Sequence, residues 1–130
     1  MAYLKFRPLT PGFDFISTLN TGDIPEEITD LLLNDEKIYV AVKTIRDVGI
    51  FTNKRILLVD VKGVFGKRKE YFSLPYNSIS TFNFLKGRIQ TKIKIVADSG
   101  HNITLRFLKS IDSKVANEVY MILTNKVMDK

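Results

Sequence analysis

The chain has 130 residues, a formal net charge of +6, one histidine and no cysteine. This length fits one domain with its own core, and the lack of cysteine excludes disulfides, thiolate zinc sites and cysteine nucleophiles. No stretch reaches the ~18 to 20 apolar residues of a membrane-spanning helix, and the first residues do not resemble a secretion signal. We therefore expect a cytoplasmic protein.

The charge is unevenly distributed along the chain. Residues 1–35 have a net charge of −4, whereas residues 36–130 have a net charge of +10. A basic body can attract acidic lipid or nucleic acid, or it can be no more than a solvated surface. The acidic N-terminal segment can dock on the basic body, within one subunit or between subunits.

The first 22 residues are predicted to be an irregular extension in front of a domain over residues 23–130. Pro8, Pro11 and Gly12 interrupt regular structure there. The extension is nevertheless too apolar for a disordered arm, so it should pack on its own domain or on a neighbouring subunit. Its large apolar side chains are Tyr3, Leu4, Phe6, Leu9, Phe13, Phe15, Ile16 and Leu19.

A short helix is predicted over residues 24–32. Asp23 and Glu26 have the spacing of a capping pair, and Pro25 suits the first turn. Apolar residues recur with helical spacing and form one stripe. They are Ile24, Ile28, Leu31 and Leu32.

From residue 37 to residue 108 the apolar residues alternate with polar ones, which predicts antiparallel strands with one wet face. Glycines at 63, 87 and 100 separate strand patterns and can adopt positive φ. The run 56–59 is apolar at every position, so that strand should be covered on both faces. The predicted strands are residues 37–45, 49–52, 55–61, 68–74, 79–85, 89–97 and 102–108.

The last predicted element is an amphipathic helix over residues 111–127, with Ser110 as its cap. One helix against a curled antiparallel sheet is an α+β arrangement, a roll or a capped barrel of seven strands. The predicted core residues are Ile56, Leu58, Ile93, Ile95, Leu105, Phe107, Val115, Val119 and Ile122.

Five segments of the chain carry a resemblance to a known family. They are residues 42–47 (VKTIRD), 51–60 (FTNKRILLVD), 66–71 (GKRKEY), 73–79 (SLPYNSI) and 92–95 (KIKI). In this order and spacing they closely resemble the bacterial pleckstrin homology (PH) domain family, over about residues 24–125. The chain departs from the family in having Phe65 where members have threonine, and in its 22-residue lead.

The resemblance implies a seven-stranded PH-like fold and a cytoplasmic protein of unassigned function that assembles into closed homo-oligomeric rings. Phosphoinositide binding belongs to eukaryotic relatives and needs a basic loop between the first two strands. The corresponding residues 46–49 pair one cation with one anion, so that activity is not expected. A shared fold does not transfer a function.

The loop over residues 62–69 is the most suggestive candidate binding segment. Apolar residues at its tip beside cations suit contact with an anionic membrane, and the alternative is a hairpin that folds back on the domain. The candidate contacts are Lys62, Val64, Phe65, Lys67, Arg68 and Lys69. The segment 51–55 is interpreted as structural, because Thr52 and Asn53 favour a tight turn.

Catalysis has little support in the sequence. His101 is the only histidine, and no nucleophile motif, phosphate-binding glycine loop or metal-ligand cluster accompanies it. We expect no enzyme activity and no cofactor. Nucleic-acid binding is also not expected, because the basic outer row of Lys92, Lys94 and Arg106 has no assured aromatic partners for base stacking.

We expect a self-assembling binding or scaffold module, and a peripheral membrane adaptor that uses residues 62–69 is the alternative. One barrel with one capping helix leaves the apolar extension and the first helix in need of a further surface, which a neighbouring subunit offers. In the alternative for the extension, it wraps its own barrel and the protein is a monomer. The candidate oligomer contacts are Tyr3, Leu4, Phe6, Phe13, Phe15, Ile28 and Leu31.

Overall fold

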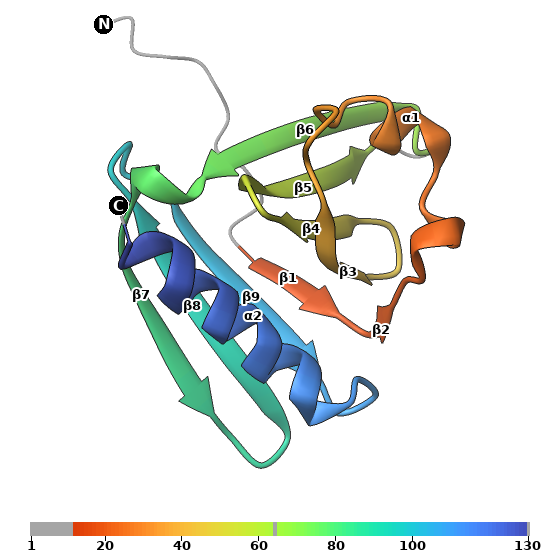
Figure 1. The fold of residues 1–130 in the computed structure, drawn as a ribbon. Helices are drawn as coiled ribbons and strands as arrows, with labels where there is room; N and C mark the ends of the chain where they lie inside the picture. The colour runs from red at the N-terminus through yellow and green to blue at the C-terminus, as the bar shows by residue number, and fades with distance from the viewer. Residues whose placement is uncertain (1–11, 64, 130) are drawn as a thin grey trace, which may run out of the picture.

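A computed structural model describes residues 12–63 and 65–129. Two β-sheets pack face to face, and the longer helix covers one open end of the sandwich (Figure 1). The strands are β1 Gly12–Phe15, β2 Ser17–Thr18, β3 Ile38–Lys43, β4 Val48–Thr52, β5 Arg55–Lys62, β6 Arg68–Pro75, β7 Ile79–Lys86, β8 Gln90–Ala97 and β9 Asn102–Leu108. The helices are α1 Glu26–Thr29 and α2 Ser113–Val127, with 3-10 turns η1 Thr21–Asp23 and η2 Tyr76–Ser78.

All seven predicted strands are present, and their ends agree with the prediction to within two residues. Alternation predicts β8 and β9 well because each has one face in the core and one in water, whereas β5 is recognised by its continuous apolar run. Gly63 and Gly100 adopt φ values of 89° and 94°, as expected for tight turns. Gly87 does not adopt positive φ in the structure, and its need for glycine is steric, since a Cβ there would lie 2.8 Å from the carbonyl oxygen of Gln90.

The sheets have the orders β1-β9-β8-β7 and β2-β3-β4-β5-β6. The predicted α+β, PH-like roll with a C-terminal helix is confirmed, although the sheets do not close into a complete barrel. β6 and β7 are the end strands of different sheets and are joined by η2. The arrangement is therefore a sandwich with an open corner.

The prediction of irregular structure over residues 1–22 is wrong for the part that the structure describes. β1 pairs in parallel with β9, and β2 pairs antiparallel with β3, so this segment crosses from one sheet to the other. Pro8, Pro11 and Gly12 precede or begin β1 and do not interrupt it. Residues 1–11 lie outside the described residues.

The main core lies between the two sheets and under α2. It contains the predicted Ile56, Leu58, Ile93, Ile95, Leu105, Phe107 and Val119, all less than 5 % exposed, while Val115 and Ile122 are partly buried against it. Asp112, and not the predicted Ser110, caps α2, because its carboxylate accepts the backbone N–H of Lys114 at 3.0 Å. The Ser110 hydroxyl instead donates to the carbonyl oxygen of Ile16 at 2.5 Å.

A second apolar cluster lies on the outer face of the five-stranded sheet. Ile24 and Ile28 pack there against Ile50, Leu57 and Val59, which confirms that β5 is covered on both faces. The helix α1 is shorter than predicted and begins after Pro25, with no side-chain hydrogen bond at its N-cap. The predicted capping pair is therefore wrong. None of the helices in the described ranges is long and apolar enough to cross a bilayer.

Candidate binding surfaces

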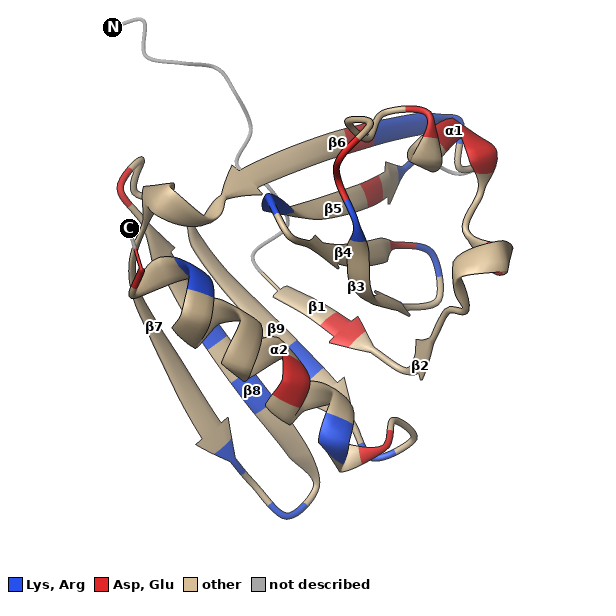
Figure 2. Ribbon diagram, in the orientation of Figure 1, with Lys and Arg blue, Asp and Glu red and all other residues tan. Residues whose placement is uncertain are grey.

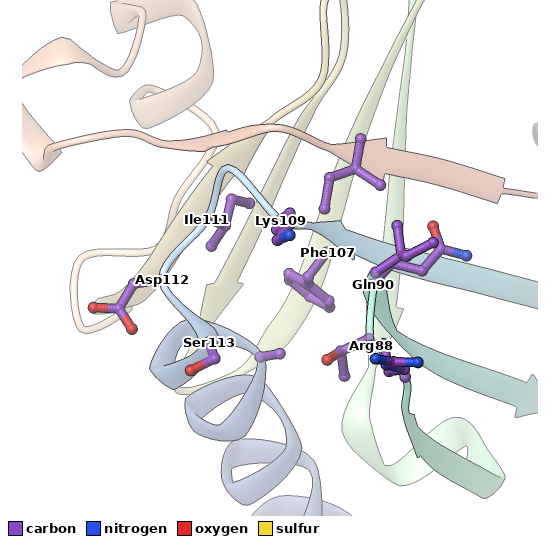
Figure 3. Close-up of a pocket in the computed structure, with 12 residues that line it drawn as sticks. Arg88, Gln90, Phe107, Lys109, Ile111, Asp112 and Ser113 are labelled. Carbon is purple, nitrogen blue, oxygen red and sulfur yellow. The ribbon is translucent and has the colours of Figure 1, made fainter.

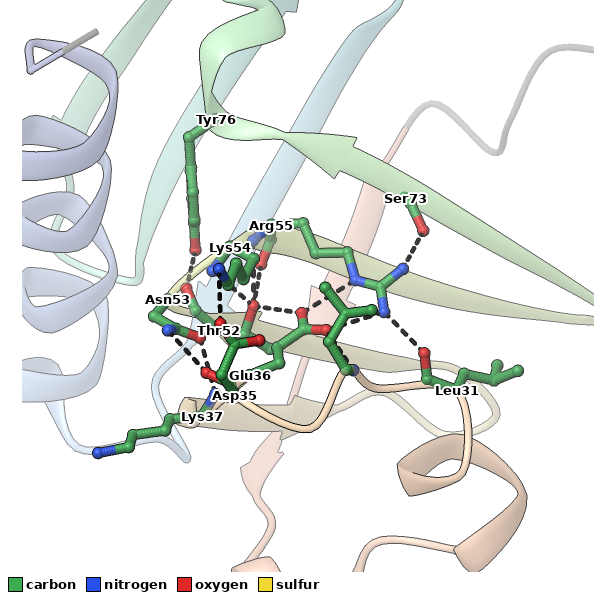
Figure 4. Close-up of polar contacts among 11 residues, drawn as sticks. Leu31, Asp35, Glu36, Lys37, Thr52, Asn53, Lys54, Arg55, Ser73 and Tyr76 are labelled. Carbon is green, nitrogen blue, oxygen red and sulfur yellow. Dashed lines mark hydrogen bonds and ion pairs between the residues drawn. The ribbon is translucent and has the colours of Figure 1, made fainter.

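The segment Thr52–Arg55 forms the tight turn predicted from its sequence. The Thr52 hydroxyl oxygen accepts the backbone N–H groups of Lys54 and Arg55, both at 3.0 Å. The side-chain oxygen of Asn53 accepts the N–H of Lys37 at 2.7 Å. These side chains are used by the turn between β4 and β5 and by the start of β3, which supports their structural role (Figure 4).

Glu36 and Arg55 form a buried ion pair beside this turn, which the sequence did not reveal. The Nε and Nη2 atoms of Arg55 lie 2.9 and 3.0 Å from the two carboxylate oxygens of Glu36, whose side chain is 0 % exposed. Burial opposes ionisation of Glu36, but hydrogen bonds from Arg55, Thr52 and the Leu33 amide together lower its pKa below the ordinary value. Arg55 also donates to the Leu31 carbonyl at 2.9 Å and thereby fixes the loop that follows α1 (Figure 4).

The loop over residues 62–69 has fewer available cations than its sequence suggests. Lys62 lies 2.8 Å from Glu70, and Lys69 lies 2.5 Å from Glu27. The hydrogen bond from Lys69 lowers the pKa of Glu27. Both lysines are therefore partly neutralised within the chain, and neither has the free charge that the membrane interpretation assumed.

Three of the predicted contacts of this loop remain on the surface. Phe65 is 82 % exposed, and the Lys67 ammonium lies 5.9 Å from its ring centroid. Arg68 is exposed at the start of β6, and Val64 lies outside the described residues. The loop thus presents one aromatic side chain and two cations.

Three of the predicted oligomer contacts are instead buried in their own chain. Phe13 and Phe15 are 1 % and 0 % exposed, because β1 directs both into the main core. Ile28 is 3 % exposed in the second cluster. The expectation that these residues face another subunit needs this correction, whereas Leu31 is 46 % exposed and remains available. Tyr3, Leu4 and Phe6 lie outside the described residues.

The acidic N-terminal segment docks on the basic body of the same chain. Asp14 pairs with Arg106 at 3.0 Å, Glu27 with Lys69, and Asp35 with Lys54 at 3.1 Å. The acidic residues around α1 lie beside the basic start of β6 (Figure 2). Of the two alternatives, docking within one subunit or between subunits, residues 12–36 therefore follow the first.

His101 lies in the turn between β8 and β9. Its Nδ1 atom is 2.8 Å from the Ser99 hydroxyl, and its ring lies 5.1 Å from that of Phe72. Within the described ranges it forms no ion pair with a carboxylate, and no cluster of three or more metal-ligating side chains occurs. The hydrogen bond of His101 in this turn is thus made with a serine hydroxyl.

A hollow of about 270 Å³ lies where the β7–β8 turn meets the start of α2 (Figure 3). Arg88 and Lys109 line it together with Phe107 and Ile111. Asp112 also lines it, but its carboxylate is used to cap α2. The hollow combines apolar walls with two cations and has no paired acid and base.

The free side of β7 is a more distinctive surface. β7 is the last strand of its sheet, and in the part of the chain that the structure describes no strand pairs with its outer side (Figure 1). Its residues 79–85 carry no charge, whereas β6, at the edge of the other sheet, carries Arg68, Lys69 and Glu70 and ends at Pro75. Charges, proline and bulges are devices that protect edge strands from pairing. β6 is protected by the first two, whereas β7 has a register irregularity only between Ile79 and Thr81 and carries no charge from Thr81 to Leu85.

A groove runs along the outer face of β7 and β8, on the side opposite α2. Lys92 and Lys94 provide its charge, and Leu85 and Val96, 55 % and 38 % exposed, are apolar. The row of Lys92, Lys94 and Arg106 was visible in the sequence as the basic face of two strands. That β7 is an edge could not be seen, because it depends on which strands pair.

Two packed, largely antiparallel sheets and a C-terminal helix define the PH-like class of folds, and solved structures show the same fold. A protein with a pleckstrin-homology domain from Shewanella loihica aligns with a TM-score of 0.75 at 24 % identity, over 85 % of this chain and 96 % of that one. A pleckstrin homology domain from Shewanella amazonensis gives 0.64 at 24 % identity, over 84 % and 89 %. A PH domain containing bacterial protein from Exiguobacterium sibiricum gives 0.69 at 20 % identity, over 88 % and 63 %. These likenesses concern the fold.

The chain belongs to the bacterial PH domain family, whose model matches residues 13–127. The match includes β1 and β2, whereas the resemblance seen in the sequence begins near residue 24. A relative from Bacillus subtilis, the uncharacterized protein YjqA, is 48 % identical over 67 residues, which are 52 % of this chain. The aligned part spans 54 % of that relative's length.

Proposed function

We propose that the protein is a non-catalytic binding or scaffold module that assembles with copies of itself in the cytoplasm. The apolar surface that remains after folding carries this proposal. In the leucine run after α1, Leu32 packs on the second cluster, but Leu31 and Leu33 are 46 % and 58 % exposed. Exposed apolar side chains that lie together favour a protein interface.

The fixed geometry of this loop supports the same interpretation. Arg55 holds the Leu31 carbonyl, and the Leu33 amide donates to Glu36 at 3.1 Å. The two exposed leucines are thus presented by a backbone anchored to a buried ion pair, so little conformational entropy is lost on binding. The sequence of residues 1–11, which directly precedes β1, contains further apolar side chains, and in this proposal they add to the contact area. A closed ring is the assembly that the family resemblance implies.

Sedimentation velocity on variants of the whole chain tests this interface. We expect Leu31→Ser with Leu33→Ser to shift the protein toward monomer. The matched control is Ile45→Ser with Met121→Ser, which removes side chains that are 89 % and 50 % exposed elsewhere, and it should leave the mass unchanged. If both double variants sediment like the parent chain, the leucine surface is not the interface. A truncation should remove residues 1–11 only, because residues 12–18 belong to the sheets.

A second candidate function is a peripheral membrane adaptor, and the exposure of Phe65 beside Lys67 is the observation in its favour. Its weakness is that Lys62 and Lys69 are paired with glutamates. At physiological salt, where exposed charges are screened beyond ~8 Å, we expect no pelleting with vesicles that contain acidic lipid. Pelleting that Phe65→Ala with Lys67→Ala abolishes would put the adaptor ahead of the scaffold.

A further inference from the structure

We propose that β7 and the basic groove beside it bind an acidic segment of another protein, which adds to the four-stranded sheet as a new strand. This site is separate from the leucine surface proposed for self-assembly. Strand addition to an exposed edge obtains its affinity from backbone hydrogen bonds and its specificity from alternate side chains.

The edge is suited to strand addition over most of its length. A register irregularity between Ile79 and Thr81 twists only the first end of β7, and pairing with β8 is regular from Thr81 to Lys86. From Thr81 to Leu85 this leaves a run of uncharged residues whose backbone groups can pair on the free side. An added strand would lie about 4.8 Å from β7.

Cross-strand pairs place the lysines of the groove directly behind this edge. Leu85 is paired with Lys92, Asn83 with Lys94, and Thr81 with Val96, all on the outer face. A side chain of the added strand that points to this face meets the polar Asn83 first. A glutamate of the added strand opposite Asn83 can reach across Asn83 toward the ammonium groups of Lys92 and Lys94 on β8. Apolar side chains of the added strand that point to the same face meet Leu85 and Val96.

The charge of this surface favours an acidic occupant. Residues 79–97 contain four cations, Lys86, Arg88, Lys92 and Lys94, and no acidic residue. Within the described ranges, neither Lys92 nor Lys94 has an ion-pair partner, unlike Lys62 and Lys69 in the loop considered above. Partners with complementary charge are steered to such a surface and held in register.

The occupant is not a segment of this chain. Its acid-rich part is folded around α1, with Glu27 and Asp35 paired to Lys69 and Lys54. Residues 1–11 contain Lys5 and Arg7 but no acidic residue. Neither of these segments supplies an acidic strand, so the proposed occupant is a segment of a different protein.

The probe is a capped peptide of about nine residues, within the usual range of strand lengths, in which glutamate and valine alternate. Fluorescence anisotropy should detect its binding to the whole chain at low salt and a loss of affinity as salt rises. Lys92→Gln with Lys94→Gln should weaken binding roughly tenfold or more, since two charge-assisted contacts are removed. The matched control, Lys37→Gln with Lys43→Gln, changes the net charge equally at two exposed positions, just before and at the end of β3 in the other sheet, and should bind like the parent chain.

Two further measurements separate strand addition from other modes of binding. A peptide with proline in place of two valines keeps the charge but cannot complete the backbone pairing, so it should bind at least several-fold more weakly. Amide hydrogen exchange along β7 should slow when the alternating peptide is bound.

Failure of the alternating peptide to bind would overturn the proposal, as would equal binding by the two lysine double variants. Equal affinity for the proline peptide would also overturn it. Binding of phosphatidylserine vesicles that depends on Lys92 and Lys94, without peptide binding, would assign the groove to membrane instead. None of these results changes the sedimentation test of self-assembly, so the two proposals fail independently.

Discussion

Substitution of Phe15 by alanine tests whether the N-terminal strand is part of the domain. The ring of Phe15 is 0 % exposed and lies 5.5 Å from that of Phe107 and 6.0 Å from that of Phe13. Removal of such a buried ring costs about 3–5 kcal/mol through lost transfer free energy and the cavity left behind. For a domain of this size, the change corresponds to a fall in Tm of roughly 10–20 °C.

The close approach of Gly49 to this ring provides an internal check. A Cβ at position 49 would lie 2.7 Å from Cζ of Phe15, so Gly49→Ala should destabilise the parent chain by about 1–3 kcal/mol through overpacking. In the Phe15→Ala background the clash is absent, and the same substitution should cost much less. A double-mutant cycle from urea unfolding measures this coupling. Additive costs, or a cost of Phe15→Ala below about 1 kcal/mol, would refute the docking of β1 on the core.

Three other predictions concern the polar network and the exposed loop. Glu36→Gln should cost about 2–3 kcal/mol at pH 7. The pKa of Glu36 is lowered in the folded state, so its contribution to stability is complete above the ordinary value of 4.5 and is lost as the pH falls through the lower folded-state pKa. Urea unfolding should therefore show the stabilities of parent and variant converging as the pH falls below 4.5. Tyr76→Phe should cost about 1–3 kcal/mol, since its buried hydroxyl donates to the Thr52 carbonyl at 2.7 Å. An unchanged midpoint of urea unfolding would mean that water takes the place of the Tyr76 hydroxyl. Phe65→Ala should change stability by less than about 0.5 kcal/mol in the same assay, as expected for an exposed side chain, and a larger loss would show that the ring folds back on the domain.

The strands from residue 38 to residue 108 and α2 could be predicted because their apolar patterns are local: burial alternates in β8 and β9, and β5 is a continuous apolar run. Ile93 and Ile95 face the core and Lys94 faces water, and this period is visible without any tertiary information. β1 could not be predicted in this way. It is four residues long and begins at Gly12 directly after Pro11, and its partner β9 lies some ninety residues further along the chain.

The binding surfaces were harder to predict than the strands. Lys62 and Lys69 looked free in the sequence, but Glu27 comes from a distant segment to pair with Lys69. The unprotected edge of β7 follows from the order of strands in the sheet, which the period of the sequence does not encode. Charge and composition therefore identified the basic face, but topology decided which part of it is open.

The native mass of the whole chain tests the central claim of self-assembly most directly. One chain has a mass of 14.9 kDa. Multi-angle light scattering at tens of micromolar protein and physiological salt should give a single species at a whole multiple of that mass, with a mass that falls in the Leu31→Ser, Leu33→Ser variant. A single species near 14.9 kDa for the parent chain would contradict the account.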